Sequence, residues 1–233
     1  MIISPKTLYD ILLNTFGQQH WWPIDEKYHL EQNSDPRFEI IVGAFLTQNT
    51  AWTNVEKALN NLKRQKALTI HKIAHIKDKS LKTMIQPSGF FNQKAKRLKL
   101  FSTYMEKKYK GDLQKLFSQE TSEIRHELLS LKGVGLETAD SILLYAGNHA
   151  VFVVDSYTKR ISQRFPFLIS STSYEEIQIF FENELASTIS KKEIVSAYRE
   201  FHALLVKLAK EYCWKDKPNC TICPLTTLCK KCL

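Results

Sequence analysis

The five cysteines all lie in the last 21 residues of the chain, at Cys213, Cys220, Cys223, Cys229 and Cys232. A disulfide framework spreads its cysteines along the chain, so this clustering indicates ligation of a metal or a metal cluster. The first four have the spacing C-x6-C-x2-C-x5-C. Zinc is the generic partner of four close cysteines, but zinc ribbons separate two pairs by about 15–20 residues. Four thiolates from one short loop favour an iron–sulfur cluster instead, with Cys232 left as a spare thiol.

A second candidate site is the segment 131–140, which has the sequence LKGVGLETAD. Its two glycines permit a tight turn between helices, and they let backbone N–H groups approach an anion closely. The helix that follows points the positive end of its dipole at the same place. The segment therefore predicts a hairpin that grips nucleic-acid phosphates without reading sequence, through Gly133, Val134, Gly135 and Thr138. An ordinary helix–helix turn with a glycine at the helix end is the alternative.

The third candidate is Asp155, which follows the apolar residues 151–154 and precedes a predicted helix. A carboxylate in that position is by default the N-cap of the helix. A carboxylate is also suited to stabilise a developing positive charge, and to orient or deprotonate water. The two roles are compatible, because a cap fixes the rotamer that the chemistry needs.

The hairpin segment, followed by residues 152–157 (FVVDSY), resembles the helix-hairpin-helix DNA glycosylases of the endonuclease III superfamily. The resemblance extends from Trp21 to the cysteine tail. It implies that Asp155 is the catalytic carboxylate, and that the first four cysteines hold a [4Fe–4S] cluster. Bifunctional members carry a lysine nucleophile two residues after the second hairpin glycine, where this chain has Glu137. The chain therefore resembles the monofunctional branch, in which water is the nucleophile.

Three further motifs narrow the resemblance to the bacterial 3-methyladenine DNA glycosylase III group: WWP at 21–23, the aromatic residue after LTQNT at 46–50, and SGFFNQKAKRL at 88–98. This resemblance implies a base pocket formed by Trp21, Trp22, Pro23 and Trp52. Core packing is the other common fate of tryptophan. A cationic alkylated purine stacked on aromatic faces gains about 0.5–2 kcal/mol.

Two polar residues are further candidates by the same resemblance. Gln48 matches a residue that fills the gap left by an extruded base, although a polar residue at a helix end explains it as well. Lys210 matches a pocket lysine, but a lysine beside a cationic base is electrostatically unfavourable, and a solvated surface role fits it too.

The elements that position these residues are predicted to be helical almost throughout. Apolar periodicity and capping residues predict helices that start at Pro5 and Pro36, the second continuing as a buried helix over 38–47. Further helices are expected over 53–64, 70–75, 78–85, 93–109, 121–132, 136–146, 155–164, 173–184 and 191–211. We therefore predict an all-α, two-domain helix-hairpin-helix glycosylase fold. By the resemblance, residues 35–150 form the six-helix domain, and residues 1–34 and 151–233 form the domain with the cluster loop.

Composition agrees with a globular protein that meets a polyanion. The chain has 233 residues, 43% of them hydrophobic, and its 33 basic and 24 acidic residues give a formal charge of +9. Such a surplus suits nucleic acid, although it also serves solubility. No apolar stretch approaches the roughly 18 residues of a membrane span, and the N-terminus lacks a basic leader. We expect a monomer in the cytoplasm, associated with the nucleoid.

Together these features predict a monofunctional DNA glycosylase that removes alkylated purines from double-stranded DNA containing a damaged base. One alternative is a bifunctional glycosylase and abasic-site lyase that acts on oxidised or mismatched pyrimidines; Glu137 argues against it. The other is a DNA-binding iron–sulfur module without catalysis, which would have no need of Asp155.

Overall fold

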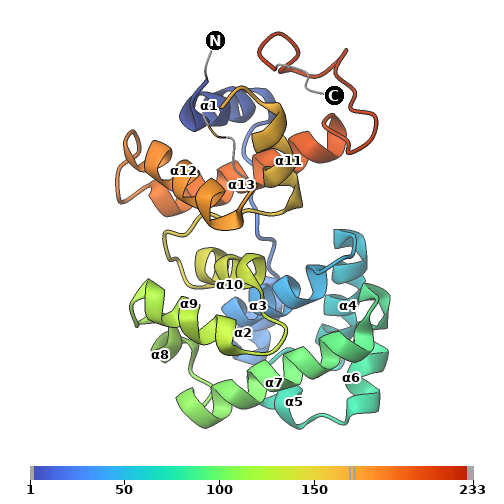
Figure 1. Cartoon of the computed structure of the whole chain (residues 1–233). Helices are drawn as coiled ribbons and strands as arrows, with labels where there is room; N and C mark the ends of the chain where they lie inside the picture. Colours follow the sequence, from blue (N-terminus) through green and yellow to red (C-terminus); the bar gives the residue numbers. More distant parts are fainter. Residues whose placement is uncertain (1–2, 168, 170–171, 230–233) are drawn as a thin grey trace. The chain divides into compact units, whose positions relative to one another are not determined.

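The computed structural model describes residues 3–167, 169 and 172–229, and this part of the chain is helical and contains no strand (Figure 1). The predicted all-α class is confirmed. Residues 151–154 are extended but pair with no other strand in the described ranges. No helix in the described ranges has the length and hydropathy needed to cross a membrane.

The chain divides into two compact units. The first comprises Met1–Trp21 and Ala150–Leu233. Its helices are α1 (Pro5–Phe16), α11 (Ser156–Arg164), α12 (Tyr174–Ala186) and α13 (Ile194–Glu211). Aromatic rings form much of its core: Phe152 stacks on Phe181 at 4.9 Å, and Phe201 lies 5.7 Å from Phe181.

The second unit comprises Trp22–His149. Its elements are α2 (Glu26–Gln32), α3 (Pro36–Thr47), α4 (Trp52–Arg64), α5 (Ile70–His75), α6 (Asp78–Ile85), the 3-10 turn η1 (Gln86–Ser88), α7 (Phe91–Tyr109), α8 (Leu113–Phe117), α9 (Thr121–Ser130), α10 (Leu136–Ser141) and the π-helix η2 (Ile142–Ala146). Residues 38–46 of α3 are all buried, as the apolar sequence predicts for a central helix. Helices α4, α7 and α10 and the π-helix pack around it.

The boundary between the units lies after Trp21, whereas the expected boundary was residue 34. Residues 22–34 belong with the second unit because a buried carboxylate of α3 binds them. Glu39 accepts hydrogen bonds from the backbone N–H of Asp25 at 3.1 Å and from His29 Nε2 at 2.9 Å. Lys63 Nζ of α4 lies 2.6 Å from the other carboxylate oxygen of Glu39. These contacts join α2 to α3 and α4.

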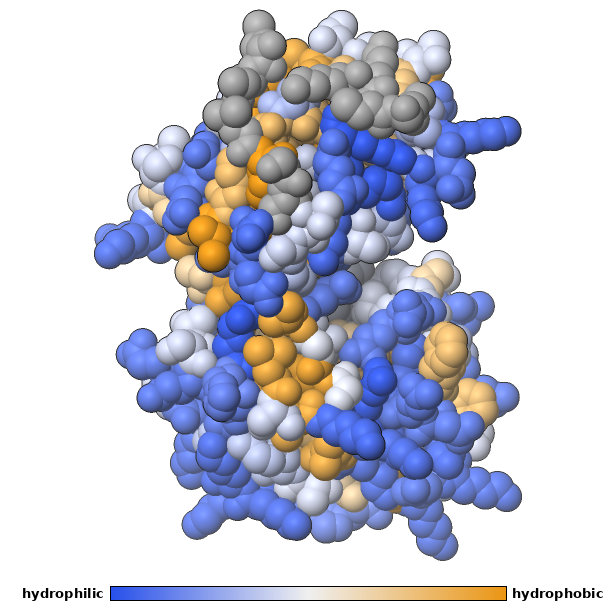
Figure 2. Space-filling model, viewed as in Figure 1, coloured by the Kyte–Doolittle hydropathy of each residue, from blue (hydrophilic) through white to orange (hydrophobic). Residues whose placement is uncertain are grey.

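Local capping signals identified the helix starts well. Ser4 accepts a hydrogen bond from the N–H of Thr7 at the start of α1, and Asp35 accepts one from the N–H of Arg37 at the start of α3. The short helices α2 and α8 were not predicted, and α10 passes into a π-helix where a continuous α-helix was expected. Hydrophilic residues dominate the face shown in Figure 2.

Candidate active site and cysteine pocket

The predicted hairpin is formed by α9, the turn 131–135 and α10. Gly133 has a φ of +91°, and a Cβ at this position would collide with the side chain of Arg97. Glycine is therefore required there, both by the backbone and by the close approach of α7. Gly135 is exposed, and a Cβ on it would meet nothing within 4 Å. The first amides of α10 thus start from an open backbone, as an anion-binding turn requires.

A buried ion pair fixes the two helices of the hairpin. Arg125 of α9 binds both carboxylate oxygens of Asp140 in α10, at 2.7 and 3.0 Å, and Asp140 is fully buried. The side chain of Val134 is also buried, and its N–H donates to the carbonyl oxygen of Leu131. Val134 therefore supports the turn from inside.

Gln48, at the C-terminal end of α3, lies against this hairpin. Its Nε2 donates to Thr138 Oγ1 at 2.8 Å and approaches the carbonyl oxygen of Gly133 at 3.4 Å. Its Oε1 accepts a short hydrogen bond from Arg97. Thr138 is buried, so its hydroxyl serves to hold Gln48. The structure thus joins three of the predicted DNA-contacting residues in one network and adds Arg97, which sequence reasoning missed.

Two of the predicted pocket tryptophans meet in the second unit. The ring of Trp22 lies 5.4 Å from Trp52 and 5.3 Å from Tyr145, edge to face in both cases. Trp22 and Trp52 are partly exposed, Tyr145 is buried, and Pro23 is exposed. The contact of Tyr145 with Trp22 was not predicted, because Tyr145 lies in an apolar segment whose pattern indicates only a buried core helix.

The Trp22 side chain packs against α3. A Cβ on Gly43 would come within 2.7 Å of Trp22 Cζ2 and 3.1 Å of its Nε1, so only glycine lets the indole lie this close to the helix. Glu39, one turn earlier on the same helix, binds the backbone N–H of Asp25 and so holds the segment that follows Trp22. Two residues of α3, four apart and hence on one face, therefore position this tryptophan.

Lys94, a buried lysine of α7, joins α3 to the 3-10 turn η1. Lys94 Nζ donates to the carbonyl oxygens of Leu46, in α3, and of Ser88, at 2.8 and 2.7 Å. Burial, assisted by the charge of Arg97, lowers the pKa of Lys94 to about 8. The turn that it holds presents Phe90, which is 65% exposed and has a φ of +44°. A bulky aromatic residue in the left-handed region is strained.

Asp155 is buried at the start of α11 in the first unit, and its cap role is confirmed: Oδ1 accepts a hydrogen bond of 2.7 Å from the N–H of Thr158. His202 Nε2 of α13 lies 3.6 Å from Oδ2. Burial alone would raise the pKa of Asp155, but His202 and Thr158 outweigh it and hold the pKa below its ordinary value. Asp155 is therefore an anion at neutral pH. The stability that it contributes is present above pH ~3.9 and is lost as the pH falls toward the lowered pKa.

The two other predicted pocket residues also belong to the first unit. Trp21 is partly exposed. Lys210 is exposed near the end of α13, and its carbonyl oxygen accepts a hydrogen bond from Trp214 Nε1 at 2.8 Å.

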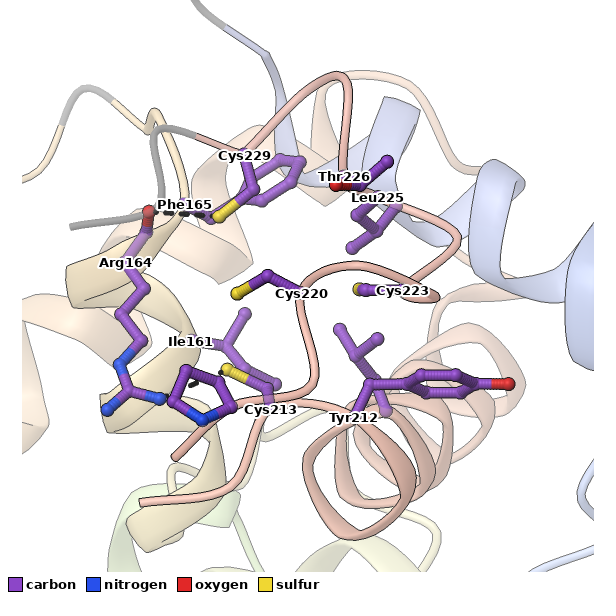
Figure 3. Close-up of a pocket in the computed structure, with 12 residues that line it drawn as sticks. Ile161, Arg164, Phe165, Tyr212, Cys213, Cys220, Cys223, Leu225, Thr226 and Cys229 are labelled. Carbon is purple, nitrogen blue, oxygen red and sulfur yellow. Dashed lines mark hydrogen bonds between the residues drawn. The ribbon is translucent and has the colours of Figure 1, made fainter. Parts of the chain in front are cut away.

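The four predicted ligand cysteines converge on one pocket, while Cys232 lies outside the described residues. Cys213, Cys220, Cys223 and Cys229 line this pocket together with apolar residues of α11 and α13, among them Ile161 and Leu208 (Figure 3). None of the four forms a disulfide. Burial raises the pKa of Cys223, and the three neighbouring cysteines raise it further.

The spacing of the thiols distinguishes between possible occupants. Within the described residues, no three of these sulfur atoms all lie within 4.8 Å of one another. A single tetrahedral zinc ion, with Zn–S bonds of about 2.3 Å, needs sulfur atoms about 3.8 Å apart. The four thiols line a pocket whose other walls are mostly apolar side chains, a donor set that suits an iron–sulfur cluster.

Two arginines of α11 hold the loop that starts at Cys213. Arg160 Nε donates to the carbonyl oxygen of Cys213 at 2.8 Å. Arg164 donates to the carbonyl oxygens of Trp214 and Lys215, at 2.7 and 2.6 Å, and approaches Cys213 Sγ at 3.5 Å. The helix that carries Asp155 at its first turn therefore also orders the cysteine loop.

A family model described as "HhH-GPD superfamily base excision DNA repair protein" matches residues 42–186, which include the second half of α3, the hairpin and Asp155. The chain belongs to the HhH-GPD superfamily. It is accordingly a DNA repair glycosylase, with DNA as its partner. Over 224 residues, 95% of its length, it is 42% identical to the "Putative DNA repair glycosylase" of Methanocaldococcus jannaschii, of which the match covers 94%.

Solved structures agree with this assignment. The glycosylase is similar to the H. pylori 3-methyladenine DNA glycosylase bound to 1,N6-ethenoadenine, with a TM-score of 0.70 and 30% identity, over 90% of this chain and 98% of that one. It also shares the fold of an endonuclease III–DNA covalent intermediate, with a TM-score of 0.75 and 21% identity, over 99% and 97% of the two chains.

The contact between Gly43 and Trp22 predicts that a glycine-to-alanine substitution in a helix will destabilise the protein, the opposite of the usual effect. In an ordinary helix interior, replacing glycine by alanine stabilises by about 1 kcal/mol. We expect Gly43→Ala to lower the free energy of unfolding of this glycosylase, because the new methyl group displaces the Trp22 indole. Urea unfolding followed by tryptophan fluorescence measures both effects.

The matched control is the same substitution in a Trp22→Ala background, where the indole is gone and alanine at position 43 should stabilise as usual. Stabilisation of both backgrounds by Gly43→Ala would contradict the contact.

Proposed function

We propose that this glycosylase is monofunctional and excises alkylated purines of the 3-methyladenine type from double-stranded DNA, acting as a monomer. The observation that carries the proposal is the aromatic cluster of Trp22, Trp52 and Tyr145, seated on α3 through Gly43. Electron-rich faces bind a cationic alkylpurine better than a neutral base. The similar H. pylori enzyme, whose structure contains an ethenoadenine, supports the same class of substrate.

The hairpin would hold the DNA backbone while the damaged nucleotide leaves the stack. The open backbone at Gly135 and the first amides of α10 suit a phosphate, and α7 contributes Arg97 beside the same turn. Two side chains would enter the gap in the duplex. Phe90 is exposed and apolar, and Gln48 is polar and would leave its hydrogen bonds to Thr138 and Arg97 to do so.

Asp155 would then support cleavage of the N-glycosidic bond. The bond between C1′ and the base nitrogen breaks with its electron pair on the base, which an N3- or N7-alkylated purine accepts without a general acid. The sugar becomes cationic, and the Asp155 carboxylate, which is ionised at neutral pH, stabilises it. Water adds to C1′, and its proton passes to the carboxylate or to solvent.

Glu137 argues for a single activity. It is exposed in the first turn of α10, at the position where bifunctional relatives of the resembled family carry a lysine. A carboxylate forms no Schiff base, so hydrolysis would end with an intact abasic site.

We also propose that Cys213, Cys220, Cys223 and Cys229 hold a [4Fe–4S] cluster. Four thiols around one apolar pocket support this ligand set. When bound, the cluster would cross-link the tail, and its assembly would be coupled to folding of the loop. Arg160 and Arg164 already hold the first segment of that loop against α11.

The catalytic role of Asp155 is tested by Asp155→Asn. The amide keeps an oxygen for the N–H of Thr158 but loses the charge, so excision should fall by at least 100-fold while affinity for undamaged duplex stays within twofold. Single-turnover excision of 3-methyladenine and fluorescence anisotropy measure the two. Asp112→Asn, at the exposed N-cap of α8, is the matched control and should leave both unchanged. Full excision by Asp155→Asn would remove this residue from the reaction.

The substrate and the single activity are tested together on duplexes with alkylated purines, oxidised pyrimidines or mismatches. We expect release of alkylated purines, strand breaks only after alkali, and no adduct on borohydride treatment. Glu137→Lys places an amine at the lyase position and should produce a trapped adduct. Preferred release of oxidised pyrimidines, or a strong adduct with the unmodified enzyme, would favour the endonuclease III-like alternative.

The cluster is tested by metal analysis of protein purified without oxygen. We expect about four irons and four sulfides per chain, with a brown colour. Cys220→Ser should lose iron and sulfide, whereas Cys232→Ser should retain both. Stoichiometric zinc without sulfide would refute the cluster.

A further inference from the structure

Two histidines and a glutamate form a cluster on the second unit that the glycosylase reaction does not use. His71 and His75 lie four residues apart on α5, and Glu106 lies on α7. His71 Nδ1 is 2.8 Å from Glu106 Oε1, and His75 Nε2 is 2.9 Å from Glu106 Oε2. The two imidazole rings are 4.7 Å apart, and one ligand atom from each of the three side chains falls within 4.8 Å of the others.

We propose that His71, His75 and Glu106 bind one divalent metal ion, such as Zn²⁺, Ni²⁺ or Cu²⁺. Two histidines at positions i and i+4 project from the same helix face, which is the spacing at which a helix chelates one ion. Imidazole nitrogens and a carboxylate oxygen are borderline and hard donors that suit Zn²⁺, Ni²⁺ or Cu²⁺ better than Mg²⁺ or Ca²⁺.

The helices hold the three donors in place before any ion arrives. Helix α5 starts at the cap of Thr69, which accepts a hydrogen bond from the N–H of Lys72, and it buries Ile70 and Ile73. At the other end of α5, Lys99 of α7 donates to the carbonyl oxygen of Ile76 at 2.8 Å. The cap fixes the start of α5, and Lys99 joins the end of α5 to α7, the helix that carries Glu106.

Accessibility also suits an ion that enters from solvent. The side chains of His71 and His75 are 76% and 63% exposed, whereas that of Glu106 is 23% exposed. The carboxylate is held near the protein surface, and the imidazoles cover it from the solvent side. An ion would replace the protons that now join each imidazole to Glu106, and three protein ligands would leave a fourth position for water.

An ion bound by these three side chains would cross-link α5 to α7. An ion that binds only the folded state raises the stability of that state by mass action. This site lies in the unit of residues 22–149 and has no thiol, whereas the cysteine pocket lies in the other unit. The two sites are therefore separable by mutation and by ligand chemistry, and this inference does not depend on which lesion the enzyme excises.

The test is a zinc titration of the full-length protein with its cysteine site filled, by calorimetry and by thermal unfolding. We expect one further equivalent of Zn²⁺ to bind at micromolar concentration and to raise the melting temperature. His71→Ala, His75→Ala and Glu106→Gln should each weaken this binding by at least tenfold and abolish the shift. His126→Ala, an exposed histidine on α9, is the matched control and should change neither.

Cobalt identifies the ligands independently of stability. Co²⁺ at this site should show weak visible bands without the strong near-ultraviolet charge transfer that thiolates produce, and His75→Ala should remove those bands. Unchanged zinc binding in all three variants, binding only at millimolar concentration, or thiolate charge transfer for the added equivalent would each overturn the proposal.

Discussion

The burial of residues 38–46 of α3 on every side is the constraint on which the second unit depends. Buried polar groups on such a helix must find their hydrogen-bond partners on neighbouring elements. Glu39 therefore recruits His29, Lys63 and the backbone of Asp25, and the carbonyl oxygen of Leu46 receives Lys94. These contacts join the segment that follows Trp22, and the turn before α7, to α3. The position of both segments therefore depends on the polar groups of one buried helix.

The same constraint explains which parts of this unit were predictable. Caps such as Asp35, the glycine turn and the cysteine spacing are local signals, and they identified α3, the hairpin and the convergence of the four cysteines from the sequence. The boundary after Trp21 depends on Glu39 reaching back to α2, and nothing near residues 22–34 reveals that contact. Lys94 and Arg97 look like members of a basic exposed face, yet Lys94 is buried between two carbonyl oxygens.

Tyr145 illustrates a second limit of sequence reasoning. In an apolar segment such as 142–146, periodicity identifies a buried helix but not which ring meets an aromatic partner from residue 22. The segment is also a π-helix, whose wider turns change the direction of each side chain. The sequence could thus predict a helix at 142–146, but it could not predict that Tyr145 contacts Trp22.

In the first unit, α11 connects Asp155 to the cysteine loop. Asp155 occupies its N-cap, and Arg160 and Arg164 bind the loop of Cys213 from its later turns. Helix α13 makes a second connection, because it carries His202 beside Asp155 and leads directly into that loop. Disorder in the cysteine loop would release the two arginines and the end of α13. The described contacts therefore join the cysteine loop to the two helices that position Asp155 and His202.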